Sequence, residues 1–281
     1  MEQVPVAVTG ATGQVGGRVA RRLAAAGIPQ RLLLRDPSRA PRLPGATVAV
    51  APYADGDAVR RALEGVHTVF MVSASESADR ADQHRAFVDA AAAAGVQHLV
   101  YLSFQGAAPD ATFTLARDHW ATEEHVRARG LLHTFLRDSL YADFLPGLVG
   151  EDGVIRGPAG DGRVAAVAQD DVADAAVAVL RDPAPHAGRT HDLTGPHALT
   201  LTEVAGTIAA VTGRPVRYSP ETVEEAFASR ASYGAPDWQV EAWVSTYTAI
   251  AAGEMADVST AVEDLTGRPA TAFEQLLRTT A

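Results

Sequence analysis

Residues 4–16 read VPVAVTGATGQVG, an apolar run that leads directly into a turn rich in glycine. The apolar run, residues 4–9, predicts a buried β-strand. From about Gln14 the apolar side chains recur at four-residue spacing as far as Gly27, which predicts a helix that stops at that glycine. A strand, a glycine turn and a helix together form the opening unit of a fold in which parallel strands alternate with helices.

The three glycines of this turn have separate expected tasks. Gly10 permits a tight turn, Gly13 lets the backbone approach a pyrophosphate, and Gly16 allows the helix to pack closely on the strand. The N–H groups at the start of the helix, with the positive end of its dipole, would face the phosphates. We therefore expect a dinucleotide site here; the alternative is a packing turn without a ligand. The candidate binding residues are Gly10, Thr12, Gly13, Gln14, Val15 and Gly16.

The alternation of strands and helices continues to about residue 140. Short apolar runs predict further strands, and helical patterns separate them. Apolar strands of this kind are typical of parallel sheets that helices cover on both faces. The expected fold class is therefore α/β, with a Rossmann-type doubly wound parallel sheet. The expected strands are 31–35, 46–50, 67–73, 97–103 and 131–137, and the expected helices are 56–64, 82–94 and 114–129.

The pattern changes in the second half of the chain. Glycine and proline cluster in residues 146–162, which predicts loops with a short hairpin. A helix is expected at 170–181, a short strand at 191–195, and further helices at 201–212, 220–230, 235–252 and 271–279. We expect two domains, a dinucleotide-binding Rossmann domain of residues 1–140, to which 165–190 return, and a smaller, mostly helical C-terminal substrate domain of residues 141–164 and 191–281.

Composition excludes several classes of protein. The chain has 281 residues, of which 47% are apolar and 21% are charged, an ordinary balance for a globular protein. No apolar stretch reaches the roughly 20 residues that a bilayer-spanning helix needs, so we expect no membrane partner. The first residues lack the basic segment and cleavage site of a secretory signal, which predicts a cytoplasmic location. The net charge of −10 argues against a nucleic-acid partner.

Two residue types are absent from the sequence. There is no cysteine, and all 24 basic side chains are arginine, so there is no lysine. Thiol nucleophiles, disulfides, Schiff-base lysines and phosphate-binding loop lysines are therefore excluded. No cluster of histidine and carboxylate side chains has the spacing of metal ligands, and we expect no metal site.

The end of the second expected strand bears on the choice of nucleotide. An acidic residue there usually binds the ribose hydroxyls of NAD, whereas an arginine accommodates the 2′-phosphate of NADP. This strand ends at Arg35, with Arg39 close behind, and a guanidinium can stack on adenine and hold a phosphate. We therefore predict NADP(H) over NAD(H). Asp36 would oppose this choice if it turned inward, and both arginines could instead be solvated.

Other strand ends supply further candidate contacts to the cofactor. The carboxyl ends of parallel strands meet at one edge of a sheet, which is where ligands bind in this fold class. Small residues there let the backbone approach a ribose, and an aromatic residue after the third strand would border adenine. The candidates are Tyr53, Ser73, Ala74, Ser75, Ser103 and Phe104.

The sequence resembles the atypical short-chain dehydrogenases of the NmrA-like group, on the strength of TGATGQVG and a second strand that ends in arginine. Several longer stretches are similar to the NADPH-dependent quinone reductase branch of that group, and the similarity covers nearly the whole chain. The resemblance implies an NADP(H) cofactor and a loop at 157–163 that closes near the nicotinamide, although this loop would serve equally as a structural turn. The stretches are 71–91, 115–130, 136–145 and 157–176.

One family device is missing. Ordinary short-chain dehydrogenases use a Tyr-x-x-x-Lys pair on the helix after the fifth strand, and the corresponding positions here are Leu115 and His119. Interconversion of alcohols and ketones therefore loses its expected acid and base. A quinone tolerates this loss, because its reduced oxygens are phenolic, with a pKa of about 10, and take protons from water. The missing pair therefore favours a quinone-like acceptor.

His119 and Tyr141 are the candidate catalytic residues. His119 would bind the nicotinamide ribose or position a quinone oxygen, with Glu123 one helical turn away to orient its ring. The alternative is a structural histidine with satisfied hydrogen bonds. Tyr141 and Phe144 would line a pocket for a flat acceptor, or else pack between domains. We expect His84 to lie on a helix surface.

The expected function is NADPH-dependent transfer of a hydride to a quinone or a similar electron-poor small molecule. A first alternative is a redox sensor of the NmrA type, which binds NADP(H) without turnover. A second is a tailoring reductase of a secondary-metabolite pathway. The apolar C-terminal helices allow a homodimer.

Overall fold

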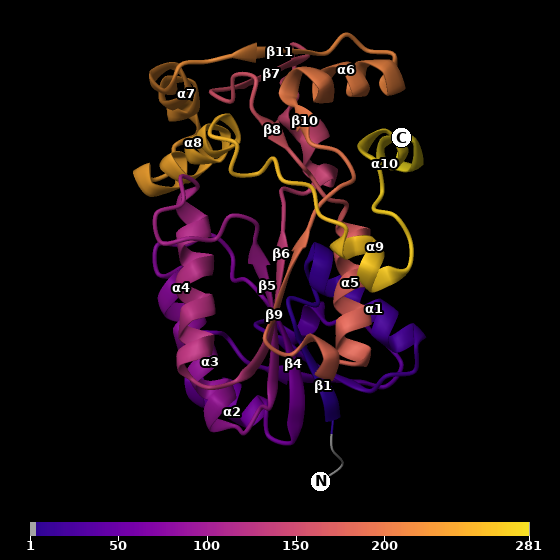
Figure 1. The fold of residues 1–281 in the computed structure, drawn as a ribbon. Helices are drawn as coiled ribbons and strands as arrows, with labels where there is room; N and C mark the ends of the chain where they lie inside the picture. Colours follow the sequence, from indigo (N-terminus) through magenta and orange to yellow (C-terminus); the bar gives the residue numbers. More distant parts are fainter. Residues whose placement is uncertain (1–3, 281) are drawn as a thin grey trace. The chain divides into compact units, whose positions relative to one another are not determined.

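The main sheet of the molecule has seven strands. The computed structural model describes residues 4–280 and arranges this sheet in the order β3-β2-β1-β4-β5-β6-β9 (Figure 1). β1 pairs in parallel with β2 and β4, β2 with β3, and β4 with β5. This confirms the expected Rossmann-type fold, and the strand order reverses between β1 and β4, where such sheets bind ligands. The strands are β1 (Val4–Thr9), β2 (Gln30–Leu34), β3 (Ala46–Val50), β4 (Val66–Val72), β5 (His98–Phe104), β6 (Leu132–Asp138) and β9 (Arg189–Leu193).

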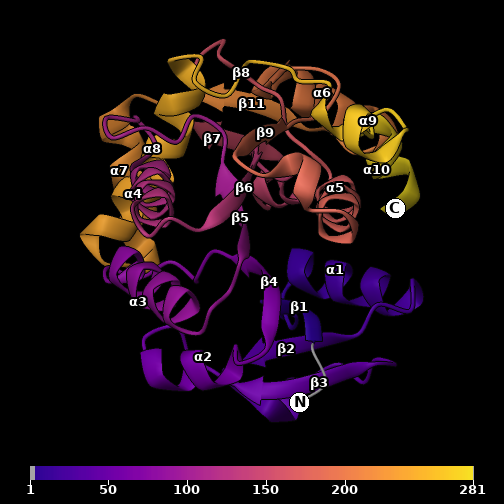
Figure 2. The same ribbon diagram turned by 60° about the horizontal axis from the view of Figure 1, so that its bottom comes forward.

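Helices cover both faces of this sheet. Figure 2 shows α1 and α5 on one face and α2, α3 and α4 on the other. Every residue of β5 is buried, so the side chains on both faces of this strand lie inside the protein, as its largely apolar run predicts. The helices are α1 (Gln14–Ala25), α2 (Gly56–Ala62), α3 (Arg80–Ala93), α4 (Thr114–Ala128) and α5 (Gln169–Arg181).

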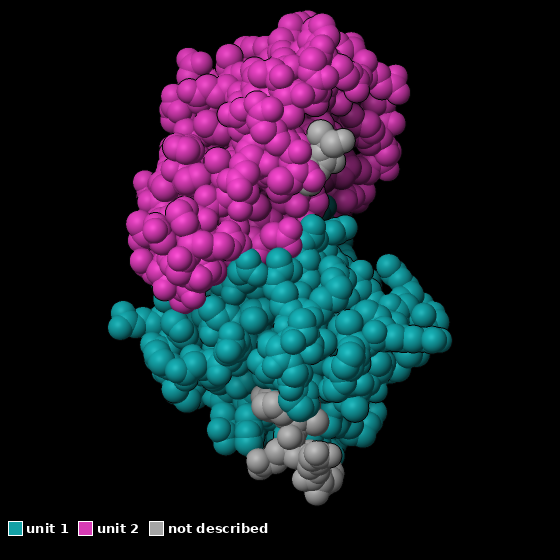
Figure 3. Space-filling model, turned by 90° about the vertical axis from the view of Figure 1, so that its right-hand side faces the viewer, with its two compact units in different colours: residues 1–103, 118–137, 172–191 teal, residues 104–117, 138–171, 192–281 magenta. Residues whose placement is uncertain are grey.

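The chain divides into two compact units, which Figure 3 shows in different colours. We call them the first unit, residues 1–103, 118–137 and 172–191, and the second unit, residues 104–117, 138–171 and 192–281. The second unit includes residues 104–117, which the sequence analysis assigned to the Rossmann domain. The division into a dinucleotide domain and a substrate domain stays a prediction.

The second unit differs locally from the expectation. The glycine-rich stretch contains the expected short hairpin, because Val149 and Ile155 form an antiparallel bridge and the Gly150 N–H donates to the Val154 carbonyl at 3.0 Å. The two named strands of this stretch pair elsewhere: β7 pairs in parallel with β11, and β8 pairs antiparallel with β10. Three further elements, β10, β11 and α9, were not predicted. The elements are β7 (Val154–Gly157), β8 (Arg163–Val164), β10 (Leu199–Thr200), β11 (Arg217–Pro220), α6 (Leu201–Thr212), α7 (Val223–Arg230), α8 (Asp237–Ala251), α9 (Ala261–Thr266) and α10 (Phe273–Thr280).

The start of α7 shows why the expected helix 220–230 was too long. The Thr222 hydroxyl accepts a hydrogen bond from the Glu225 N–H, and the Glu225 carboxylate accepts one from the Thr222 N–H. This reciprocal capping box fixes the first helical residue at Val223. The residues before it are free to extend as β11 beside β7.

Each unit has its own apolar core. That of the first unit lies between the sheet and the helices α2 and α3, and that of the second unit surrounds α6. Complete burial of one such side chain stabilises the fold by about 1.5–3 kcal/mol. Within residues 4–280, no helix combines the length and the apolarity that crossing a bilayer requires. Fully buried members are Phe87, Tyr101, Phe135, Leu99 and Leu63 in the first unit and Ile155 and Leu201 in the second.

Candidate functional site

The glycine turn after β1 has the geometry that its sequence predicts. Gly10 has a φ of +65°, a left-handed conformation that favours glycine, and its carbonyl accepts a hydrogen bond of 2.8 Å from the Gly13 N–H. A Cβ atom on Gly16 would lie 2.4 Å from the Gly10 carbonyl oxygen. The helix α1 therefore sits so close to β1 that only glycine fits at position 16.

A groove of about 470 Å³ opens beside this turn in the first unit. The ends of β1, β2 and β4 and the turn after β3 border it, so it lies at the carboxyl edge of the sheet where the strand order reverses. The first turn of α1 carries no acidic side chain that would repel a phosphate. The predicted residues that line the groove are Gly10, Thr12, Gly13, Gln14, Val15, Gly16, Arg35, Tyr53, Ser73, Ala74 and Ser75.

Arg35 and Arg39 both line the end of the groove next to β2. Asp36 turns to its own backbone, because its carboxylate accepts hydrogen bonds from the Ser38 N–H, at 2.9 Å, and from the Ser38 hydroxyl, at 2.6 Å. These bonds lower the pKa of Asp36. They cap the short helix η1 (Pro37–Arg39) and hold the carboxylate toward its own turn.

Tyr53 forms a fixed wall of the groove. Its hydroxyl donates a hydrogen bond of 2.6 Å to the Val72 carbonyl and is also hydrogen-bonded to the Thr9 hydroxyl. Its ring packs on Phe87 with a centroid distance of 4.5 Å. Burial raises the pKa of Tyr53, so the phenol stays protonated and acts as a structural donor.

The backbone of Ala74, which lines the groove, is held from behind by α3. The Ala74 N–H donates to His84 Nε2 at 2.8 Å, and the Arg80 Nε donates to the Ala74 carbonyl at 3.1 Å. The expectation that His84 lies on a helix surface is wrong, because its side chain is fully buried. Both backbone polar groups of Ala74 point into the protein, and Ala74 lines the groove together with Ser73 and Ser75.

The hydrogen-bond partners of His84 define its protonation. The Thr122 hydroxyl donates a hydrogen bond to the Asp118 carbonyl. The Thr122 oxygen is therefore the acceptor in its 2.8 Å hydrogen bond with His84 Nδ1. Nε2 is then the acceptor for Ala74. Burial, with the nearby Arg80 charge, lowers the pKa of His84 to about 3. The ring is therefore neutral and serves to position the backbone.

His119 is also buried and engaged at both ring nitrogens. An Arg80 N–H donates to His119 Nε2 at 2.8 Å, and His119 Nδ1 lies 3.0 Å from the Tyr101 hydroxyl. Burial, followed by the Arg80 charge, holds the pKa of His119 well below its usual value, so the ring is neutral. Arg80 and Tyr101 thus hold the ring, instead of Glu123 as the sequence analysis expected.

Glu123 forms a separate buried cluster. Arg137 donates to both carboxylate oxygens, at 2.8 and 2.7 Å, and the Ser103 hydroxyl donates to Oε1 at 2.6 Å. The Glu123 side chain is fully buried, and this bidentate pairing with Arg137 balances its charge. Among the described residues that line the groove, none is Ser103, Phe104 or His119. The structure therefore does not bring these three candidates together with the others.

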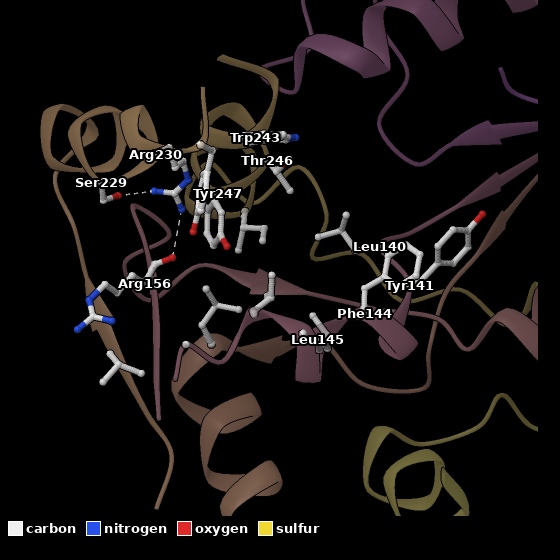
Figure 4. A pocket seen from close by; sticks show the side chains of 17 residues that line it. Leu140, Tyr141, Phe144, Leu145, Arg156, Ser229, Arg230, Trp243, Thr246 and Tyr247 are labelled. Atoms are coloured by element: carbon white, nitrogen blue, oxygen red, sulfur yellow. Dashed lines mark hydrogen bonds between the residues drawn. The ribbon is translucent and has the colours of Figure 1, made fainter. Parts of the chain in front are cut away.

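Phe104 and Tyr141 belong to the second unit. Phe104 is buried and packs on Phe113, with ring centroids 4.9 Å apart. The Tyr141 hydroxyl donates a hydrogen bond to the Asp138 carboxylate. Burial of the phenol, together with the negative charge of Asp138, raises the pKa of Tyr141 well above its usual value. Tyr141 and Phe144 both line a second cavity, of about 700 Å³, which Figure 4 shows from close by.

The glycines at both ends of the 157–163 loop are packed against α8. A Cβ on Gly157 would lie 2.2 Å from the ring of Tyr247, and a Cβ on Gly162 would lie 2.1 Å from the Ile250 carbonyl oxygen. These contacts match a structural turn, the second of the two expectations for this loop.

Sequence reasoning missed residues that act from outside the local motifs. In the first unit, Arg80 and Tyr101 join the buried network, and in the second unit Arg230, Trp243 and Tyr247 line the cavity. A buried arginine has no distinct signal in the sequence, because its burial depends on partners far along the chain.

The fold and the groove define the class of the protein, a Rossmann-type α/β chain with a glycine turn at the switch point of its sheet. A model of the NmrA-like family matches residues 2–263. The chain therefore belongs to the NmrA-like family.

Two relatives and one solved structure are similar along nearly their whole length. Quinone oxidoreductase 2 of Escherichia coli is 33% identical, covering 96% of each chain. The (4-alkanoyl-5-oxo-2,5-dihydrofuran-3-yl)methyl phosphate reductase of Streptomyces griseus is 40% identical, covering 95% of each. The crystal structure of an NADPH-dependent quinone oxidoreductase of Escherichia coli, complexed with NADPH, superimposes with a TM-score of 0.90 at 32% identity and covers 98% of this chain and 99% of that one.

Proposed function

We propose that this chain is an NADPH-dependent oxidoreductase that reduces a quinone or a similar electron-poor small molecule. The observation that carries the proposal is the groove, because it joins the glycine turn, two arginines and the end of β4 at the edge where Rossmann sheets bind dinucleotides. The named activities of its relatives, which include quinone reduction and the reduction of an unsaturated ring, support the same class of reaction.

The residues of the groove fit NADPH by their chemistry. The backbone N–H groups at the start of α1 would bind the pyrophosphate, as the close approach at Gly13 and Gly16 allows. Arg35 and Arg39 would hold the 2′-phosphate. Tyr53 would border the adenine, and the segment from Ser73 to Ser75 would contact a ribose. NADPH, when bound, supplies a hydride to the acceptor.

Among the candidate residues that the structure describes, His84, His119 and Tyr141 are not placed to transfer a proton. His84 and His119 are neutral, buried and fixed by hydrogen bonds. The Tyr141 hydroxyl donates a hydrogen bond to the Asp138 carboxylate, and burial keeps the phenol protonated. A quinone that accepts a hydride needs one further proton to become a quinol, and water supplies it, because the product oxygens are only weakly basic phenolates. A ketone would need an acid, and His84, His119 and Tyr141 do not provide one.

His119 then positions other residues and does not transfer a proton itself. It supports Arg80, which holds Ala74 at the groove, and both of its ring nitrogens are occupied. We assign the acceptor to the cavity of the second unit, where Tyr141 and Phe144 provide aromatic walls for a flat ring.

The test is a kinetic assay with a panel of quinones, which follows the loss of NADPH absorbance. We expect turnover with NADPH, and a lower kcat/KM with NADH because NADH lacks the phosphate that Arg35 and Arg39 would bind. Tight binding of NADPH with no turnover on any acceptor would overturn the proposal and favour a redox sensor.

A further inference from the structure

The cavity of the second unit is large and has several aromatic side chains in its wall. Its volume of about 700 Å³ falls in the range of roughly 300–1,000 Å³ that is typical of sites for drug-sized ligands. Trp243 and Tyr247 line one part, and Tyr141 and Phe144 line another (Figure 4). Tyr233 also lines the cavity. A single small ring would leave much of this space empty, so the shape favours a ligand with fused rings or an apolar substituent.

One positive charge in the cavity wall is neutralised inside the protein. Arg230 donates to the Glu221 carboxylate at 3.0 Å, and the two side chains are only 10% and 11% exposed. The guanidinium lies over the ring of Tyr247, 5.1 Å from its centroid. It also donates to the Ala226 and Arg156 carbonyls, at 2.9 and 3.3 Å. Glu221 and the carbonyls therefore already satisfy this cation.

The other arginine of the lining is paired in the same way. Arg156 donates to both carboxylate oxygens of Asp152, at 3.1 and 2.6 Å. This pair is about half exposed, so solvent screens it and its contribution is weaker than that of the buried pair. Each arginine of the cavity thus has its own carboxylate partner.

We propose that this cavity selects neutral, extended, apolar acceptors over anionic ones, and that Glu221, with a smaller effect from Asp152, determines this selectivity. The inference rests on the proposed function for the identity of the ligand as an acceptor. An anionic ligand would have to compete with Glu221 for Arg230 and would lose its hydration in a cavity that holds no unpaired positive charge to replace it. A neutral ring loses little hydration and gains stacking contacts with the aromatic walls.

Binding without turnover provides the first test. Calorimetric titration of the full chain, without NADPH, should show that menadione binds at least about tenfold more tightly than a sulfonated naphthoquinone of the same ring system, a difference of about 1.4 kcal/mol. Trp243→Ala, which removes part of the aromatic wall, should weaken the binding of menadione. Equal affinities for the two quinones, or an unchanged affinity in Trp243→Ala, would overturn the inference.

The second test changes the charge of the pair. Glu221→Gln keeps an oxygen acceptor for Arg230 but removes the neutralising charge. The ratio of kcat/KM for the sulfonated quinone to that for menadione should rise by on the order of tenfold, because Arg230 can then form a charge-assisted bond to the sulfonate. Asp152→Asn should move the ratio in the same direction by a smaller factor, and it provides the test if Glu221→Gln does not fold.

Glu274→Gln is the matched control. Glu274 forms an exposed ion pair with Arg278 on α10 and does not line the cavity, so the ratio should not change. An unchanged ratio in a folded Glu221→Gln variant would contradict the inference. Selective binding of menadione without any turnover would instead leave the inference standing and refute the proposed function, so the two failures are distinguishable.

Discussion

Gly16 determines how closely α1 approaches β1. Because a Cβ there would lie 2.4 Å from the Gly10 carbonyl oxygen, Gly16→Ala must push the helix away from the strand and from the groove. We expect NADPH binding to weaken by about tenfold or more and stability to fall by roughly 1–3 kcal/mol, as for other overpacked sites. Fluorescence titration with NADPH and denaturant unfolding measure the two effects.

The control for this substitution is Gly206→Ala in α6. No atom lies within 4 Å of the Cβ that this change adds. Alanine has a higher helix propensity than glycine, so stability should stay equal or rise, with NADPH affinity unchanged. A Gly16→Ala variant that binds NADPH like the wild type would contradict the role of the turn.

Arg35 should decide between the two nicotinamide cofactors. In Arg35→Ala the dissociation constant of NADPH should rise by roughly tenfold while that of NADH changes little, because only NADPH has a phosphate for the guanidinium to bind. Arg42→Ala is a suitable control, since Arg42 lies on the same connection but outside the described lining of the groove. An equal loss for both cofactors would show that Arg35 does not read the phosphate.

Individual residues could be predicted from sequence where a backbone motif fixes their position. The glycine turn, Arg35 and the segment from Ser73 to Ser75 all line the groove, because each follows a strand that ends at the same sheet edge. Ser103 also ends a strand, yet its hydroxyl turns to the buried Glu123. The direction of a side chain after a strand depends on partners from distant parts of the chain, which a single sequence does not reveal.

At the scale of elements, the connection between β4 and α3 depends on a buried histidine. His84→Ala removes the acceptor of the Ala74 N–H, so the segment that borders the groove should lose its fixed position. We expect the KM for NADPH to rise several-fold with a smaller change in kcat, because the effect is on cofactor binding.

A histidine on the next helix provides the control for this prediction. His125 is partly exposed and pairs with Asp89 outside the network, so His125→Ala should leave the KM for NADPH unchanged. His84→Gln, whose amide oxygen can accept from Ala74, should restore part of the affinity. Equal kinetics of His84→Ala and the wild type would show that the Ala74 segment holds its position unaided.

Elements with a strong local signal were predicted correctly, and those that depend on distant partners were not. The strands β1 to β6 and the helices between them follow from apolar runs and glycine stops, and they occur close to the expected positions. In contrast, β11 is four residues long and exists because it pairs with β7, more than 50 residues earlier in the chain. The hairpin of the glycine cluster was predictable because its turn is local and joins Val149 to Ile155, whereas the strand partners of β7 and β8 are remote in the sequence.

At the scale of the whole molecule, the buried histidines and tyrosines of the described network and cavity predict a simple pH profile. The pKa of His84 is about 3, that of His119 is lowered, and those of Tyr53, Tyr101 and Tyr141 are raised. These two histidines therefore stay neutral, and these three tyrosines stay protonated, from about pH 6 to about pH 8. We expect kcat for a quinone to be nearly constant over that range.

Steady-state kinetics with menadione at saturating NADPH test this expectation. A sigmoidal or bell-shaped dependence with an apparent pKa near 7 would show that a group of the chain transfers a proton in the rate-limiting step. The same assay with NADPH that carries deuterium on the transferred position identifies whether that step is the hydride transfer.

Arg230 has a mechanical consequence for the second unit. Its guanidinium links the Ala226 carbonyl of α7 to the Arg156 carbonyl of β7, while its face supports the ring of Tyr247 on α8. Arg230 thus links α7, β7 and α8 around the cavity, so the cavity has its shape before a ligand binds. Because the cavity is preformed, the protein loses little conformational entropy when a ligand of matching shape binds. A rigid ligand also loses little, so rigid molecules should bind better than flexible ones of equal size.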